Sequence, residues 1–110
     1  MHRVVITNVF PELEKGRCSI KRCVGDTVVV EADIFTDGHT EVAASLLYRK
    51  ADEKEWQRVE MEPRENDRWQ ADFKVDAVGK YLYRLQAWQN QERALPPKAQ
   101  ITEYETTLSV

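Results

Sequence analysis

The sequence predicts an all-β fold, a two-layer sandwich that forms a single domain over residues 1–110. Three observations support this prediction. Apolar and polar residues alternate along much of the chain, which is the pattern of half-buried strands. Turn-forming residues interrupt these runs at short intervals, and no window of about 11 residues keeps the spacing of an amphipathic helix. The length of 110 residues is less than one typical domain of about 150 residues.

The first half of the chain contains three clear strand signals. We expect strands at Val4–Val9, Val28–Phe35 and Val42–Arg49, with a further possible strand at Ile20–Val24. The pair Asp37-Gly38 is typical of a tight hairpin turn. The sequence therefore predicts that the strands on either side of this pair are hydrogen-bonded neighbours.

The second half continues the same pattern. We expect strands at Trp56–Met61, Trp69–Val75, Tyr81–Trp88 and Gln100–Leu108. Seven or eight strands at this spacing favour an immunoglobulin-like β-sandwich. Tyr81 follows a glycine at the entrance of its strand, as the tyrosine corner of such domains does, although a simple core tyrosine would give the same pattern.

Composition excludes several classes of function. The chain has 16 basic and 19 acidic residues and a net charge of −3, which argues against nucleic acid and anionic membranes as partners. No apolar run approaches the roughly 20 residues of a membrane span. Met1, His2 and Arg3 lead directly into a strand-like segment, so we expect no signal peptide.

The cysteines favour a cytoplasmic protein. Cys18 and Cys23 are the two cysteines of the chain. If the residues between them are extended, their Cα atoms lie about 16 Å apart. A disulfide needs a separation below about 7 Å. We therefore expect two reduced thiols, as in cytoplasmic proteins.

Motifs for catalysis or cofactor binding are missing from the sequence. None of the serines lies in a nucleophile elbow, and the four glycines form no phosphate-binding loop. His2 and His39 lack metal-ligand spacing with the cysteines. The sequence therefore predicts no catalytic residue, no metal and no cofactor, and it argues against a self-contained enzyme.

The three tryptophans indicate a candidate interaction surface. Trp69 shares a face with Ala71 and Phe73 and is expected in the core. Trp56 and Trp88 alternate with the inward residues of their strands and are expected to point outward, with Leu47 between them. Such an apolar patch is typical of a sugar platform or a protein interface. In the alternative reading, loops or arginine stems cover these side chains.

The chain also resembles a known family. Over residues 3 to 88 it is similar to the N-terminal domain of alpha-1,4-glucan:maltose-1-phosphate maltosyltransferases, enzymes of the alpha-amylase class and of glycoside hydrolase family 13. The similarity is carried in order by Arg3-Val4-Val5-Ile6, Val24-Gly25-Asp26, Asp37-Gly38-His39, Leu46-Leu47-Tyr48-Arg49, Met61-Glu62-Pro63, Asn66-Asp67-Arg68-Trp69, Gly79-Lys80-Tyr81 and Ala87-Trp88. After Trp88 the chain departs from the family pattern, because a short segment and a closing strand replace a longer, partly helical one.

The resemblance implies a function in glycogen metabolism. In this family an immunoglobulin-like domain precedes a (β/α)₈ catalytic barrel and contributes to homodimer assembly. The expected function is thus a non-catalytic accessory domain whose partner is the catalytic barrel or a second subunit. The alternative is a module that binds α-glucan such as glycogen or maltodextrin. A third reading, an unrelated immunoglobulin-like adhesion domain, is disfavoured by the reduced cysteines and the missing signal peptide.

Overall fold

The computed structural model describes residues 4–10, 27–36, 41–75, 79–89 and 101–109. These residues form strands β1 (Val4–Phe10), β2 (Thr27–Thr36), β3 (Val42–Lys50), β4 (Gln57–Glu60), β5 (Glu62–Pro63), β6 (Arg68–Lys74), β7 (Lys80–Gln89) and β8 (Thr102–Ser109), with a short 3₁₀ turn, η1 (Glu65–Asp67). No helix in these ranges has the length and apolar character needed to cross a membrane. The predicted strand at Ile20–Val24, the cysteines, the histidines and the Asp37-Gly38 turn lie outside the described residues.

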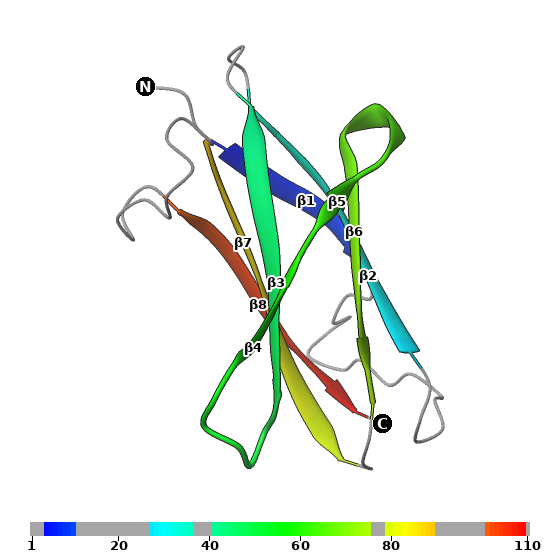
Figure 1. Ribbon diagram of the computed structural model, residues 1–110, viewed down its shortest axis with the longest axis vertical. Coiled ribbons are helices and arrows are strands. Elements are labelled where there is room, and N and C mark those ends of the chain that lie inside the picture. The colour runs from blue at the N-terminus through cyan, green and yellow to red at the C-terminus, as the bar shows by residue number, and fades with distance from the viewer. Residues whose placement is uncertain (1–3, 11–26, 37–40, 76–78, 90–100, 110) are drawn as a thin grey trace.

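Two antiparallel sheets face each other, which confirms the predicted all-β sandwich (Figure 1). One sheet has the strand order β1-β2-β6-β5, and the other has the order β4-β3-β7-β8. The seven strong strand predictions agree with the observed strands to within about two residues. The two-residue strand β5 was not predicted, because Pro63 is typical of a turn.

The predicted hairpin between β2 and β3 is wrong. β2 pairs with β1 and β6, whereas β3 belongs to the other sheet and pairs with β4 and β7. The apolar sides of the two strands, represented by Val30 and Leu46, both contribute to the core between the sheets. Placing the strands in opposite sheets lets these sides face each other, an arrangement that a local turn signal does not reveal.

The core consists of alternate residues from both sheets. Val30, Leu46 and Tyr83 are fully buried. Tyr48 of β3 stacks on Phe73 of β6, with ring centroids 4.6 Å apart and an interplanar angle of 15°, so this pair joins the two sheets directly. The core contains Val4, Val9, Val28, Val30, Ala32, Ile34, Ala44, Leu46, Met61, Ala71, Phe73, Val75, Tyr81, Tyr83, Leu85 and Ala87.

Trp69 and Tyr81 lie where the alternation placed them. Trp69 is half-buried, packs against the core and pairs with Ala32 of β2, as predicted for the inward-facing tryptophan. Tyr81 is 3% exposed and belongs to the core cluster. Its ring centroid lies 6.1 Å from that of Phe73.

A hydrogen bond joins the two sheets along one side of the sandwich. The Thr102 hydroxyl of β8 donates to the backbone oxygen of Val4 in β1 at 2.8 Å. β1 and β8 are edge strands of different sheets. The contact therefore fixes the first described strand against the last.

A bulge interrupts the pairing of β1 with β2. Thr7 pairs with Asp33, but the next aligned pair is Phe10 with Glu31, so β1 carries one extra residue in this interval. Asn8 in the bulge has a φ of 51°, a left-handed conformation that asparagine tolerates better than most residues. As a result, Val9 points into the core while Phe10 is exposed.

The core assignment predicts different costs for two similar substitutions. Leu46→Ala should destabilise the domain by about 2–5 kcal/mol, because it leaves a cavity between the sheets. Leu82→Ala, on the outer side of β7 where the side chain is only half-buried, is the matched control and should cost clearly less. Urea unfolding of both variants measures the difference, and equal losses would contradict the assignment of inner and outer faces.

Candidate functional site

The outer face of the sheet β4-β3-β7-β8 carries the side chains that the sequence singled out. β3 lies between the strand that follows Trp56 and the strand that carries Trp88, as predicted. Ala44 and Leu46 of β3 belong to the core cluster, whereas Leu47 does not. This alternation places Leu47 and Arg49 on the outer face, again as predicted.

The register separates the two tryptophans. Trp88 lies opposite Ala43, and Gln57 lies opposite Tyr48, so Trp56 is at the level of Arg49. Six residues of β3 separate these levels, which corresponds to about 20 Å. Trp56, Leu47 and Trp88 therefore share a sheet face, but the two tryptophans do not form one continuous patch.

These side chains are also largely covered. Leu47 and Trp88 are each only 8% exposed, and Trp56 is half-buried. The register places Leu47 between Arg58 and Arg84. Arginines therefore neighbour both Leu47 and Trp56, as the alternative of coverage by arginine side chains expects.

The guanidinium groups of two arginines lie over the ring of Trp56. The guanidinium carbon of Arg84 lies 4.6 Å from the ring centroid, and that of Arg49 lies 4.9 Å from it. At these distances the positive charges are attracted to the negative face of the indole. A sugar ring that stacks on Trp56 would have to compete with these contacts.

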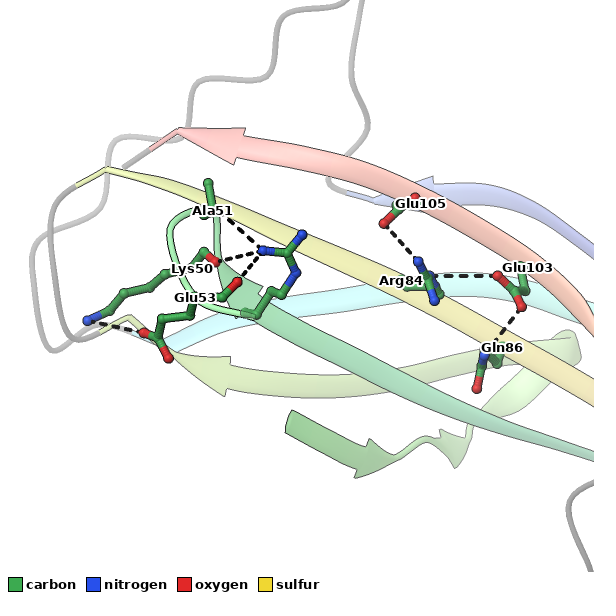
Figure 2. A network of polar contacts seen from close by, with 8 residues as sticks. Lys50, Ala51, Glu53, Arg84, Gln86, Glu103 and Glu105 are labelled. Atoms are coloured by element: carbon green, nitrogen blue, oxygen red, sulfur yellow. Dashed lines mark hydrogen bonds and ion pairs between the residues drawn. The ribbon is translucent and has the colours of Figure 1, made fainter. Parts of the chain in front are cut away.

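Two separate groups of polar contacts hold the two arginines in place (Figure 2). Arg84 forms ion pairs with Glu103 at 3.6 Å and with Glu105 at 3.2 Å on β8. Gln86 donates to Glu103 at 3.4 Å and accepts a hydrogen bond from Arg58 at 3.0 Å. Arg49 donates to the backbone oxygens of Lys50, Ala51 and Glu53. These contacts join β4, β7 and β8 across the outer face, and they hold Arg49 against the turn that follows β3.

A second polar cluster lies on the outer face of the other sheet. Asp33 accepts a hydrogen bond from the Asn8 side-chain amide at 2.7 Å and another from Arg68 at 3.2 Å. Arg68 also donates to the backbone oxygen of Asn8 at 2.7 Å. First the Asn8 bond and then the Arg68 bond lower the pKa of the Asp33 carboxyl below its usual value.

The exposed large apolar side chains of the described residues surround this cluster. They are Phe10, at 58% exposed, and the cross-strand pair Val5 and Phe35, each at 38%. Sequence reasoning missed this face because simple alternation, continued through β1, turns Phe10 inward. Asn8, a residue that accepts positive φ, was the available signal of a bulge.

No group of three or more potential metal ligands occurs within the described ranges. The fold and its two polar outer faces thus define a small β-sandwich domain whose charged side chains form surface networks. A family comparison places this domain more narrowly. Residues 2–101 match the family described as alpha-1,4-glucan:maltose-1-phosphate maltosyltransferase, domain N/S, and the chain belongs to this family.

Similar proteins carry the same description. The chain is 51% identical over 86 residues to the alpha-1,4-glucan:maltose-1-phosphate maltosyltransferase of Chlorobaculum tepidum, which covers 78% of this chain and 13% of the relative. It is 42% identical over 89 residues to the enzyme of that name from Salinibacter ruber, covering 81% of the chain and 13% of the relative. The chain is 36% identical over 88 residues to the relative from Burkholderia pseudomallei, and this alignment covers 80% of the chain and 8% of the relative. The chain therefore spans only a small part of the length of these relatives.

The contact between Trp56 and Arg84 should be measurable as a coupling energy. In a double-mutant cycle of Trp56→Ala and Arg84→Ala, we expect a coupling of about 0.5–1 kcal/mol, the usual size of an exposed cation–π contact. The control pair is Arg84 with Trp88, which lies four residues further along β7. The coupling energy of this pair should stay below about 0.5 kcal/mol. Denaturant unfolding gives all terms of both cycles, and equal couplings would contradict the stacked geometry.

The lowered pKa of Asp33 predicts a pH-dependent contribution to stability. Because the folded-state pKa is depressed, the contribution is fully present above the unfolded-state pKa of about 3.9 and is lost as the pH falls through the lower folded-state pKa. The free energy of unfolding of the native chain should therefore exceed that of Asp33→Asn at pH 7, with the difference shrinking below about pH 4.

Urea unfolding at pH 7, 5 and 3 tests this prediction. Asn8→Gly, which keeps the positive φ accessible but removes the amide donor, should reduce the pH dependence of the native chain. A stability difference between the native chain and Asp33→Asn that does not change with pH would show that the charge of Asp33 contributes nothing.

Proposed function

We propose that this chain is a non-catalytic accessory and interaction domain of an alpha-amylase-class maltosyltransferase that acts in α-glucan metabolism. The observation that carries the proposal is the family match over residues 2–101, combined with alignments that cover only 8–13% of relatives bearing the maltosyltransferase name. Most of each relative lies outside the aligned region, and this remainder is long enough to contain a catalytic domain.

The architecture supports a role in contact rather than in chemistry. The described charged side chains form pairs on open sheet faces, as Arg84 does with Glu103 and Glu105. Such ion pairs hold the side chains of an exposed surface in place. Catalysis instead requires an acid and a base at defined places around a substrate. We propose that the sandwich is of immunoglobulin type, in agreement with its strand order, and that it works in the cytoplasm.

The proposed partner is the catalytic barrel or a second subunit of a homodimer. Trp56, with Leu47 and Trp88 on the same sheet face, remains our candidate for this contact. Arginine and tryptophan are enriched where protein interfaces have their strongest contacts, and Arg49 and Arg84 already hold the Trp56 ring in a fixed position. A preorganised side chain loses less conformational freedom when a partner binds.

A chimera tests the proposal. The aligned segment of the Chlorobaculum tepidum enzyme would be replaced by this chain, and phosphate release from maltose 1-phosphate would be measured with glycogen as acceptor. We expect turnover from the chimera and none from the isolated chain, because the reacting groups belong to the rest of the enzyme. Turnover by the isolated chain, abolished by a point substitution in it, would overturn the proposal.

The same chimera tests the candidate contact residues. Trp56→Ala should weaken subunit or domain association by about tenfold or more, as the loss of an interface hot spot does. Gln57→Ala, the exposed neighbour at the start of β4, is the matched control and should leave association unchanged. Analytical ultracentrifugation and limited proteolysis report the two kinds of association, and unchanged values for Trp56→Ala would remove this face from the proposal.

A further inference from the structure

The outer face of β1, β2 and β6 combines exposed aromatic rings with a preformed polar cluster. Phe10 and Phe35 are its exposed rings, and Asn8, Asp33 and Arg68 form the cluster between them. The family match assigns no role to these residues. The proposed contact surface around Trp56 lies on the opposite sheet.

The register sets the order of these groups along the face. Val5 pairs with Phe35, Thr7 pairs with Asp33, and Phe10 pairs with Glu31, while Arg68 lies opposite Asp33 on the other side. The levels of Phe35 and Phe10 are four residues of β2 apart, which corresponds to about 14 Å. The polar cluster is halfway between the two rings.

The cluster can still make hydrogen bonds outward. The side chains of Asp33 and Arg68 are each 27% exposed, and Arg68 also forms a longer ion pair with Glu31 at 4.0 Å. The Asn8 side chain donates to Asp33, and within the described ranges its amide oxygen has no partner. A carboxylate, a guanidinium and an amide fixed side by side offer both donors and acceptors to a ligand with many hydroxyl groups.

A shallow hollow extends the polar region across the sheet. It is lined by Pro63, Arg64, Glu65 and Arg68, so it begins at the cluster itself. Arg64 donates to Gln70 at 3.1 Å, which holds a second guanidinium at the edge of this hollow. The face therefore offers fixed polar groups over β2, β6 and β5, with an exposed ring at either end of the β1–β2 pair.

The bulge at Asn8 creates this arrangement. It adds one residue to β1 and thereby turns Phe10 outward, beside Glu31. The same residue supplies the amide that bonds Asp33. One irregularity of the backbone thus accounts for both an exposed ring and a member of the cluster.

The order of polar and apolar groups distinguishes between possible ligands. A protein interface has an apolar centre with a polar rim. This face has a polar centre with apolar side chains at both ends, which is the reverse. A sugar chain fits the observed order, because its hydroxyl groups can bond the central side chains while the C–H faces of its rings lie on aromatic rings.

We infer that the outer face of β1, β2 and β6 is a binding site for a linear oligosaccharide, with Phe10 and Phe35 as stacking platforms and Asn8, Asp33 and Arg68 as hydrogen-bonding partners. Arg68 is shared by two carboxylates, Asp33 and Glu31, and the resulting negative charge disfavours an anionic ligand but not an uncharged sugar. The inference does not depend on the proposed accessory function, since a contact domain on one sheet leaves the other sheet free. The rings of this site carry no arginine of the kind that covers Trp56 among the described residues.

NMR titration of the 110-residue chain tests the site. Maltoheptaose is the first probe, because the relatives' name refers to an α-1,4-glucan, and cellopentaose supplies the β-1,4 linkage. We expect saturable shifts of backbone amides in β1, β2 and β6 with at least one of these sugars, and the response to each identifies the linkage. No saturable binding of either sugar, or shifts centred on β3, β4 and β7, would overturn the inference.

Substitutions identify the groups that bind. Phe10→Ala and Phe35→Ala should each weaken binding about tenfold, whereas Trp56→Ala on the opposite sheet should leave the affinity unchanged. Phe10→Leu keeps an apolar side chain but removes the ring, so it should lose as much affinity as Phe10→Ala. Dispersed amide spectra show that each variant is folded, and native affinity in the folded Phe10 variants would contradict the site. Turnover of the chimera is a separate measurement and fails or succeeds independently.

Discussion

The pairing of β3 with β7 is the constraint on which the rest of the sandwich depends. Nine consecutive residue pairs, from Val42 with Gln89 to Lys50 with Tyr81, fix the register of the two central strands. This register puts Leu46 beside Leu85 in the core and Leu47 beside Arg84 outside. A slip of one residue in β7 would turn its whole apolar set outward, so the core and the outer face are determined together.

The two outer faces differ because their charged side chains find different partners. On the sheet β4-β3-β7-β8, Arg84 bonds the carboxylates of β8 and at the same time lies over Trp56, so charge covers the apolar ring. On the other sheet, Arg68 is directed to Asp33 and to the bulge in β1. The aromatic rings of Phe10 and Phe35 there are left exposed.

Strand positions could be predicted from the sequence because alternation reports burial directly. The same signal assigned the inner and outer sides of β3 correctly. It could not report how far along the sheet two residues lie, because that depends on register, and so it joined Trp56 and Trp88 into one patch. It also missed the bulge at Asn8 and the assignment of β2 and β3 to different sheets, since both depend on pairing between distant segments.

The bond between Thr102 and Val4 has a consequence for the order of folding. It joins residues that are 98 positions apart, so closing this side of the sandwich requires the first described strand to wait for the last. Long-range pairing of this kind is slow, because a large loop must close before any contact is gained. During synthesis β1 therefore stays without its contact to β8 until residue 102 has left the ribosome.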